Sequence, residues 1–421
     1  MRAALLRRRH ALVLGGGRLV AFAALAHVVN DAFVYGLPVF LPGIQLRFGW
    51  GEATLASLVT LVAIASNVAQ GVSGTLVDRW GRRRSAAVGV LTVAVMISLV
   101  PSIEHPFLLV AVLVAGGFGS ALFHPAAAAL VRSTGGGATA LGIYGAGGPI
   151  GVALFPVAAL ALLEVAGPEG VLVLAWGGVL AALGFLAFVP HQPPAPRPPR
   201  GVRGTRGWGR PPSIDTTLLR GRSGALLTIG TLQATADLTF LSSLPLLMTG
   251  RWGLETTSPW LAAGLAAYQL AAAAGSMGIG LIDARWPRRW VVAGSFVAAG
   301  PFLTATLILP PTTAAFLVAA AFAGAFTSSV IPLLIAQAQD EAPDRLGAAT
   351  GMQVGVTWGL AGIAYLGVGV LQQAFGVTAA MAVAYAALVP ALLLALRAVR
   401  HVPTPADAEP VAPLPALEAP A

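Results

Sequence analysis

The sequence contains no cysteine and no lysine, and only 10% of its 421 residues are charged. Without cysteine, the chain can form no disulfide, no thiol nucleophile and no cysteine-ligated metal site. Soluble domains carry about 25% charged residues, so the low charge excludes a water-soluble globular protein. Hydrophobic residues make up 57% of the chain instead. This composition is typical of a protein that crosses the membrane many times.

Long apolar segments follow one another along the chain. A helix needs about 20 apolar residues to cross about 30 Å of hydrocarbon. Twelve segments meet this requirement, six in each half: 18–46, 52–76, 85–102, 106–131, 137–163, 168–190, 221–249, 256–282, 290–310, 312–338, 346–373 and 376–397. The sequence therefore predicts an all-α membrane protein with twelve transmembrane helices.

The arginines indicate how these helices are oriented. If the N-terminus lies in the cytoplasm, all of the 25 arginines except Arg47 and Arg251 fall on the cytoplasmic side. Cytoplasmic loops of membrane proteins carry such an excess, so we expect a multi-pass protein of the cell (inner) membrane with both termini cytoplasmic. The net charge of +9 then reflects loops that face anionic lipid. No aromatic and basic face accompanies these loops, and we expect no nucleic-acid partner.

The segments between the apolar runs divide the chain into domains. Residues 191–220 are rich in proline and arginine and cannot bury a core, so we expect a flexible cytoplasmic linker there. It would join six-helix bundles at 18–190 and 221–398. We interpret residues 1–17 as a cytoplasmic leader, because glycines and Arg18 interrupt its apolar run. Residues 399–421 are expected to form a disordered cytoplasmic tail.

The chain contains an internal repeat, because short motifs of its first half recur about 206 residues later. Three separated pairs share this nearly constant offset: 27–31 with 233–237, 74–84 with 280–289, and 123–125 with 330–332. Secondary transporters are commonly built from such repeats and bind substrate between them. The duplication therefore favours a transporter over other classes of membrane protein.

One loop motif carries a family resemblance. Gly74-Thr75-Leu76-Val77-Asp78-Arg79-Trp80-Gly81-Arg82-Arg83 lies in the predicted cytoplasmic loop between spans two and three. It closely resembles the loop signature of the major facilitator superfamily, whose members are transporters with two pseudo-symmetric six-helix bundles. The resemblance implies a cytoplasmic latch in which Asp78 faces the start of span eleven, near 347–351. The expected latch residues are Gly74, Asp78, Arg79, Gly81, Arg82 and Arg83.

A narrower resemblance concerns three of the spans. His27, Asn30 and Asp31 in span one, Gly119-Ser120-Ala121-Leu122-Phe123-His124-Pro125 in span four, and Gly147-Gly148 with Gly151 in span five resemble the fosmidomycin-resistance branch of drug exporters. The chain departs from that branch at three places, since it has Ala126 in place of Glu, Pro149 in place of Asn and Leu141-Gly142 in place of Gln-Ser. The resemblance implies drug export.

Asp31 and Asp237 are the only acidic residues in the interior of the predicted spans, since the others fall in loops, tails or the capping positions at span ends, and they occupy equivalent positions of the two repeats. A carboxylate at bilayer depth costs about 2.5–3.5 kcal/mol, so such residues usually mark an ion or substrate path. His27, Asp31 and Tyr35 follow one another at intervals of four and share a helix face. By the family resemblance, spans one, four, seven and ten line the central cavity, which would also hold His124.

These positions predict proton coupling, with Asp31, Asp237, His27 and His124 as the titrating groups. Opening first to one side of the membrane and then to the other changes how firmly a buried carboxylate holds its proton. Asp31 could therefore load a proton on one side and release it on the other. The expected substrate-binding residues are the polar side chains inside the spans: Asn30, Tyr35, Asn67, Gln70, Tyr144, Gln233, Gln269 and Gln353.

Purely structural roles remain open for several of these groups. Asp31 could pair with His27 or cap the bend before Pro38, and Thr235 and Thr239 could hold Asp237. His124 could bond the carbonyl that Pro125 leaves free. Glutamines such as Gln269 and Gln353 could link helices to one another.

The leading hypothesis is a proton-coupled secondary transporter that exports a small amphiphilic or anionic compound by alternating access. We expect a monomer that is not an enzyme and needs no cofactor beyond the coupling protons. A proton-linked importer or passive facilitator of organic acids is the first alternative. A metal transporter, in which His27, Asp31 and His124 bind a divalent ion, or a non-transporting substrate sensor is the alternative from another class.

Overall fold

A computed structural model describes residues 16–135, 137–190, 219–283, 285–342 and 346–399. The leader, the linker and the tail expected from the sequence lie almost entirely outside these ranges. Every regular element within them is helical, as the predicted all-α fold class requires.

The described part of the first half contains eight α-helices, several of which join end to end. They are α2 (Gly16–Val34), α3 (Leu37–Phe48), α4 (Glu52–Ala63), α5 (Gln70–Trp80), α6 (Arg82–Leu99), α7 (Pro106–Arg132), α8 (Gly137–Gly170) and α9 (Ala175–Phe188). Pro38 lies in the first turn of α3, where a missing amide hydrogen costs nothing. A π-helical turn, η1 (Ile64–Val68), connects α4 toward α5. Gly167 interrupts α8 with φ 69°, and this break separates two of the predicted spans.

The second half repeats this plan with nine α-helices. They are α10 (Gly221–Trp252), α11 (Pro259–Asp283), α12 (Arg288–Ile308), α13 (Ala314–Ser328), α14 (Ile331–Glu341), α15 (Leu346–Gly351), α16 (Thr357–Phe375), α17 (Val377–Ala386) and α18 (Leu388–Ala398). A second π-helical turn, η6 (Met352–Val356), joins α15 to α16. Pro332 lies at the start of α14, at the position that answers to Pro125 in the first half.

The helices agree with the twelve predicted spans. Nine helical stretches of the described chain are long and apolar enough to cross a membrane, and the 49-residue stretch Ala140–Phe188 contains two of the predicted spans. The segment Glu52–Val68, which consists of α4 and η1, is a shorter apolar helix that α5 extends. The remaining span is α10, whose 32 residues include Gln233 and Asp237. The description is therefore consistent with twelve transmembrane helices.

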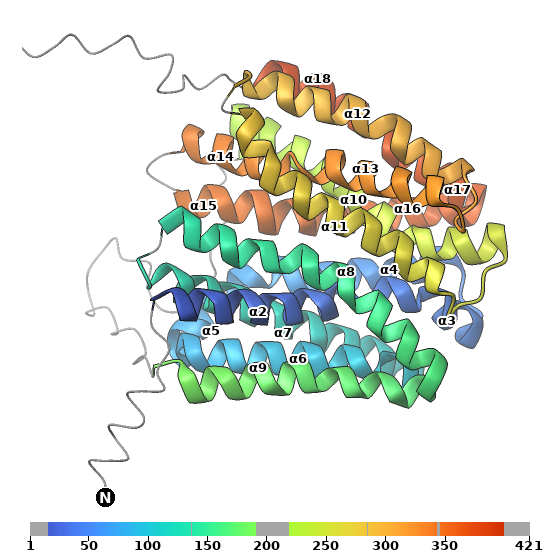
Figure 1. Ribbon diagram of the computed structural model, residues 1–421, viewed down its shortest axis with the longest axis horizontal. Helices are drawn as coiled ribbons and strands as arrows, with labels where there is room; N and C mark the ends of the chain where they lie inside the picture. Colours follow the sequence, from blue (N-terminus) through green and yellow to red (C-terminus); the bar gives the residue numbers. More distant parts are fainter. Residues whose placement is uncertain (1–15, 136, 191–218, 284, 343–345, 400–421) are drawn as a thin grey trace, which may run out of the picture.

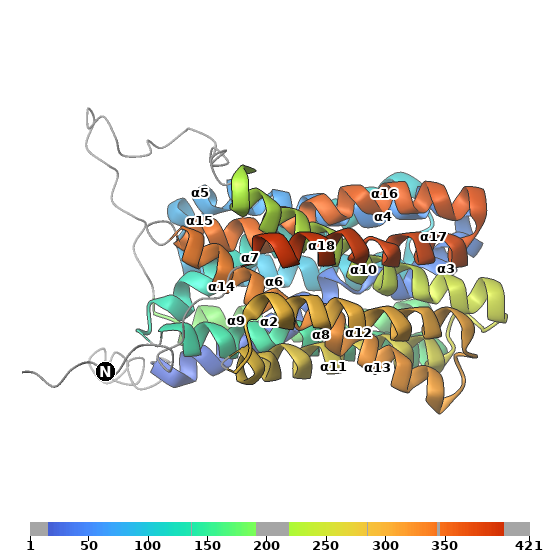
Figure 2. The ribbon, with the colours of Figure 1, turned by 90° about the horizontal axis from the view of Figure 1, so that it is seen from above.

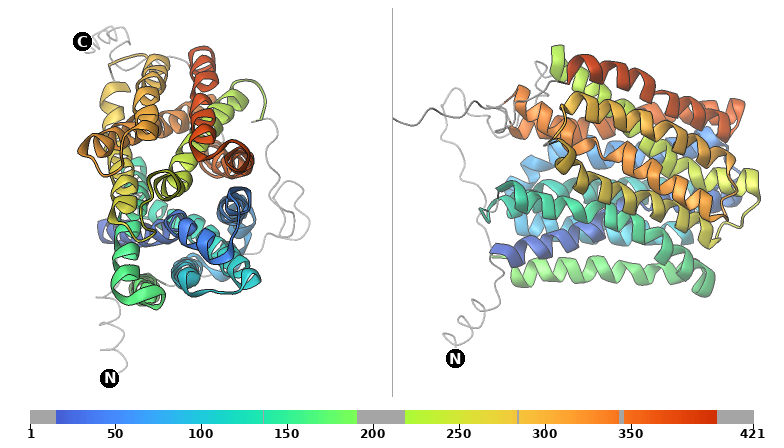
Figure 3. Two further views of the ribbon diagram at one scale, coloured as in Figure 1. Left: turned by 90° about the vertical axis from the view of Figure 1, so that its right-hand side faces the viewer. Right: turned by 45° about the horizontal axis from the view of Figure 1, so that its top comes forward.

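The helices run nearly side by side (Figure 1). Those of the first half occupy the lower part of Figure 1 and those of the second half the upper part, and the end-on view in Figure 3 separates the two groups again. The two groups meet where α4 packs on α16 and α8 packs on α11, pairs that also lie side by side in Figure 2. This arrangement places a seam between the repeats.

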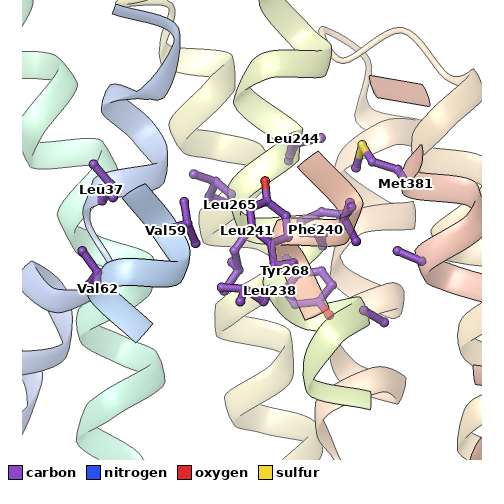
Figure 4. Packing of buried hydrophobic residues seen from close by; sticks show 14 of the residues in the cluster. Leu37, Val59, Val62, Leu238, Phe240, Leu241, Leu244, Leu265, Tyr268 and Met381 are labelled. Carbon is purple, nitrogen blue, oxygen red and sulfur yellow. The ribbon is translucent and has the colours of Figure 1, made fainter. Parts of the chain in front are cut away.

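Close packing holds the seam together toward the end at which α4 begins and α16 ends. The hydroxyl of Thr60 in α4 donates to the carbonyl of Gly362 in α16 at 2.7 Å, and the amide of Ala53 donates to the side chain of Gln373 at 3.3 Å. A shared apolar core contains Leu37 and Val59 from the first half and Leu244 from the second (Figure 4). The small residues of α4 and α16 let their backbones approach this closely.

Arg47 and Arg251, the two exceptions to the arginine rule, have a local structural role. Arg47 donates to the carbonyls of Ile103 at 2.7 Å and of Pro101, at the end of the third span. Arg251 donates at 3.0 Å to the carbonyl of Leu307, at the corresponding end of α12. A cation at a helix C-terminus also opposes the helix dipole favourably. The repeat therefore extends to this pair, which sequence inspection did not predict.

Candidate functional site

Three titratable side chains of the first half meet in one buried cluster, which we call the His-Asp-His cluster. Nε2 of His27 lies 3.2 Å from one carboxylate oxygen of Asp31, and Nε2 of His124 lies 3.1 Å from the other. His27 and Asp31 stand one turn apart on α2, whereas His124 comes from α7. The predicted stripe on span one and the expected proximity of His124 are both present in the structure.

Main-chain and side-chain partners fix the orientation of this cluster. Nδ1 of His27 lies 2.8 Å from the carbonyl of Tyr144, and Nδ1 of His124 lies 3.0 Å from the carbonyl of Ser120. Asn30 donates to Asp31 at 2.9 Å and to the Ser120 hydroxyl at 3.0 Å. His124 therefore bonds the carbonyl of Ser120 and reaches Asp31 as well. This is not the carbonyl that the structural alternative named, because the one that Pro125 leaves without its helical donor is that of Ala121, four residues earlier.

Glycines of α8 allow the cluster to be closed from one side. A Cβ atom at position 148 would lie 2.6 Å from the Asp31 carboxylate, and one at position 151 would lie 2.0 Å from the carbonyl of Val28. Only glycine permits so close an approach between α2 and α8. The ring of Tyr144 stacks on His27 with the centroids 4.3 Å apart. The glycines quoted from span five thus serve helix packing around the cluster.

The second carboxylate has a different environment. Asp237 of α10 accepts from Gln233 at 2.5 Å, from Ser328 at 3.1 Å to each oxygen, and from the Tyr268 hydroxyl. All three donors are neutral, and Tyr268 and Ser328 come from α11 and α13. The side chain of Asp237 therefore joins three helices, and Tyr268 stands among the buried core residues in Figure 4.

The threonines proposed as partners of Asp237 do not hold it. The hydroxyl of Thr235 donates to its own helix, to the carbonyl of Thr231 at 2.7 Å. The hydroxyl of Thr239 has no partner within the described part of the chain. This structural alternative named the wrong residues, because each threonine lies two positions from Asp237 and therefore points to another side of the helix.

Several of the expected substrate-binding residues gather at the seam between the repeats. Tyr35 of the first half contacts Trp358 of the second, with ring centroids 5.7 Å apart. Asn67 lies on the π-helical turn η1 and Gln353 on η6, and these two turns contact one another. Gln353 also packs against Gly230 of α10. π-helical turns occur often at functional sites, so this region of the seam is the structural candidate for substrate contact.

The other expected binding residues have local partners or lie on other helices. Gln70 follows η1 and donates to the carbonyl of Ser66 in that turn at 3.1 Å, and Gln233 is bound to Asp237. Gln269 is buried on α11, the helix that packs on α8. The hydroxyl of Tyr144 is buried beside His27 and has no partner among the described residues.

The expected latch is described only in part. Gly81 separates α5 from α6 with φ 86°, a backbone conformation that residues other than glycine rarely adopt. Arg82 donates to the carbonyl of Ala129 at 3.4 Å and Arg83 to that of Leu186 at 2.5 Å, and Arg79 is exposed. The contacts of Gly74 and Asp78, and those of Gly347 on the opposite helix, lie outside what the structure describes.

The His-Asp-His cluster also has the composition of a metal site. The ligand atoms of His27, Asp31 and His124 all lie within 4.8 Å of one another. Each histidine bonds a main-chain carbonyl through Nδ1, the orientation in which metal-binding histidines present Nε2 to an ion. The donor set therefore suits a divalent cation as well as a proton.

The fold and the site together identify a class of protein, and comparison with known families agrees. The family model of the Major Facilitator Superfamily matches residues 23–366. The chain belongs to this superfamily of transporters. It is therefore a multi-pass membrane protein, not an enzyme, and the family implies a small-molecule substrate.

Individual relatives place the chain more closely. It is similar to the fosmidomycin resistance protein of Escherichia coli (strain K12), with 26% identity over 351 residues, which covers 81% of this chain and 82% of the relative. It is also similar to the uncharacterized MFS-type transporter YfnC of Bacillus subtilis (strain 168), with 22% identity over 86% of this chain and 88% of that protein.

Solved structures share the fold at low sequence identity. A crystal structure of the nucleoside transporter NupG matches with a TM-score of 0.73 and 14% identity, over 91% of this chain and 100% of that one. A bacterial homologue of the human lysosomal transporter Spinster, in an inward-facing and occupied conformation, matches with a TM-score of 0.67 and 15% identity, over 92% and 98%. The major facilitator fold expected from the loop motif is confirmed.

Proposed function

We propose that the protein is a proton-coupled exporter that moves a small amphiphilic or anionic compound across the membrane by alternating access. The observation that carries this proposal is the contact between His27 and Asp31 inside the first bundle. Both groups can hold a proton, and both are buried. A pair of this kind in a transmembrane helix is a natural proton carrier.

Hydrogen bonding limits the number of protons that the pair can hold. The carbonyl of Tyr144 can only accept, so Nδ1 of His27 must carry a hydrogen. The remaining nitrogen then faces a carboxylate oxygen of Asp31 at 3.2 Å. If neither atom carried a proton, two acceptors would face each other, which is unfavourable. The contact therefore holds a single exchangeable proton, on the histidine or on the carboxylate.

Loss of this proton provides the link to movement. Without it, the His27–Asp31 contact becomes repulsive. Asp31 then retains Asn30 as a donor, and it retains His124 only while that histidine also carries a hydrogen on Nε2. The histidines and Asn30 connect α2 to α7 and α8, the helices that surround the cluster. Deprotonation would therefore loosen the first bundle at the depth of the cluster. The second bundle, whose Asp237 meets only neutral donors, would mainly shape the substrate site.

The similarity to the fosmidomycin resistance protein supports export and suggests fosmidomycin as the first compound to test. Purified protein in liposomes should move fosmidomycin when a pH gradient is imposed. We expect Asp31→Asn to abolish the dependence on the gradient and Asp237→Asn to weaken transport. Asp340→Asn is the matched control, because this carboxylate is exposed at the end of α14. If Asp31→Asn and Asp237→Asn both leave gradient-driven transport unchanged, the proposed proton role is wrong.

The direction of transport needs a separate measurement. A proton-linked importer or passive facilitator would use the same cluster. Cells that express the protein should accumulate less fosmidomycin than cells that lack it, and they should tolerate more of the drug. Higher accumulation in the expressing cells would instead identify an importer.

The ligand atoms of the His-Asp-His cluster make divalent-metal transport the second candidate function. Zinc would displace the shared proton and bind the two Nε2 atoms with the carboxylate. Calorimetric titration of the purified protein with zinc distinguishes the two functions. Stoichiometric binding that His124→Gln removes would favour the metal, whereas no binding would exclude it.

A further inference from the structure

A groove on the outer face of the first bundle has the chemistry of a phospholipid site. It lies at the cytoplasmic ends of α5 and α6, extends to α9, and has a volume of 490 Å³. The residues that matter for its chemistry are Arg79, Trp80, Arg84, Val88, Leu91 and Leu186. We call it the Arg84 groove.

Polar and apolar residues are segregated along the Arg84 groove. Arg79, Trp80 and Arg84 stand at its cytoplasmic rim, and the remaining lining residues are apolar. Leu91 lies seven residues beyond Arg84 on the same helix, which places it about 10 Å deeper in the membrane. A phospholipid has the same order of parts, because its charged phosphate lies at the membrane surface and its acyl chains lie below.

The apolar part of the groove faces the bilayer. Trp80, Val88, Leu91 and Leu186 are between 36% and 47% exposed, although their side chains are large and hydrophobic. In a transmembrane protein, lipid acyl chains cover such exposed hydrophobic side chains. A tryptophan at the end of a span is also typical of the membrane interface.

The rim of the groove is rigid and positively charged. Arg83 ties α6 to α9 by donating to the carbonyl of Leu186 at 2.5 Å. Arg84 is exposed, and the other described residues that line the groove below the rim are apolar. A phosphate at the rim would therefore meet the positive charge of Arg84. Basic pockets between transmembrane helices on the cytoplasmic side bind anionic lipid headgroups in this way.

The second repeat offers an internal comparison. A groove of 520 Å³ lies between α11, α12 and α13, with Trp286 and Trp290 among its lining residues. Trp286 occupies the position in the second repeat that is equivalent to Trp80, but no arginine is among the described residues that line this second groove. It can accept an acyl chain without selecting for the headgroup.

We propose that the Arg84 groove binds one anionic phospholipid of the cytoplasmic leaflet, with the phosphate against Arg84 and an acyl chain along Val88 and Leu91. This site is independent of the transported substrate and of proton coupling. A lipid bound there would make the latch loop sensitive to the lipid composition of the inner leaflet, because Arg79 belongs both to the groove and to the expected latch.

Native mass spectrometry of the delipidated full-length protein tests the site. The protein is titrated with phosphatidylglycerol and, separately, with phosphatidylcholine of the same acyl chains. We expect one tight phosphatidylglycerol that is preferred over phosphatidylcholine, and a loss of about fivefold in this preference in Arg84→Gln, the usual contribution of one arginine. Val88→Trp should lower the binding of both lipids, because the indole fills the groove while the charge stays unchanged.

Arg132→Gln is the matched control, since Arg132 is an exposed arginine at the end of α7 that lines neither groove. Thermal unfolding verifies that all variants fold. Equal binding of the two lipids by the unaltered protein would overturn the proposal. So would an equal loss in Arg132→Gln, which would indicate diffuse attraction, or displacement of the lipid by excess inorganic phosphate, which would indicate a site for a free anion.

Discussion

Replacing Gly148 by alanine should disable the His-Asp-His cluster without removing any of its titratable groups. The added Cβ would lie 2.6 Å from an oxygen of Asp31 and 3.3 Å from the ring of His27. Ordinary contact begins near 3.4 Å, so the carboxylate or α8 has to move by about 0.8 Å. Helix α8 already lies against α2 at Gly147 and Gly151, and it can retreat only by losing that packing.

The size of the effect follows from these distances. A carboxylate displaced by about 0.8 Å takes the 3.2 Å contact with His27 to about 4 Å, beyond hydrogen bonding. Overpacking of this kind costs about 1–3 kcal/mol. If the cost falls on the proton-loaded cluster, the occupancy of that state drops by about five- to 150-fold.

Proton movement in liposomes measures this loss. Fosmidomycin is added on one side, and a pH-sensitive dye reports the protons that cross in exchange. Gly148→Ala should slow the exchange by at least about fivefold. Gly145→Ala is the control on the same helix, because a Cβ there meets nothing within 4 Å. Unchanged exchange in Gly148→Ala, with normal folding, would refute the assigned role of the cluster.

Three further substitutions test other parts of the account. Tyr268→Phe removes a donor to the buried Asp237 carboxylate and should lower the free energy of unfolding by about 1.5–3 kcal/mol, measured by thermal unfolding. Tyr144→Phe is the control and should cost little, because the Tyr144 hydroxyl has no described partner. Equal losses would show that the hydrogen bond to Asp237 does not stabilise the protein. Gly369→Leu places its Cβ atom 2.2 Å from that of Ala56 across the seam and should slow transport by preventing α4 and α16 from closing on each other. Gly367→Leu, whose Cβ meets nothing within 4 Å, should not slow it, and similar rates in both variants would argue against closure at Gly369. Arg47→Gln should lower the free energy of unfolding by about 1 kcal/mol, because two carbonyls at the end of the third span lose their donor; a change no larger than that of the exposed Arg289→Gln would show that the cap is unimportant.

The sequence predicted the parts of the site that depend on spacing along one helix. His27 and Asp31 differ by four positions, which fixes them on one face, and the repeat offset paired Asp31 with Asp237. The contact with His124 needed the family resemblance, because no periodicity relates α2 to α7. The twelve spans were visible for a simpler reason, since each must be apolar over its whole length.

Contacts between helices could not be predicted from one sequence. Tyr268 and Ser328 bind Asp237 only because α11 and α13 turn those faces toward α10, and helix rotation leaves no mark in an apolar segment. The same holds for the meeting of η1 and η6, since nothing in the residues around Asn67 or Gln353 indicates a π-helical turn. Thr235 and Thr239 looked like partners of Asp237 by proximity in sequence, although helical geometry directs them elsewhere.

One proton should reside between His27 and Asp31 and leave when substrate is exchanged. A direct measurement adds fosmidomycin to purified protein in a weakly buffered solution and counts the released protons with a pH indicator. We expect about one released proton per protein and none from Asp31→Asn, while Asp237→Asn should still release it. An undiminished release from Asp31→Asn would show that the proton is not held at this pair.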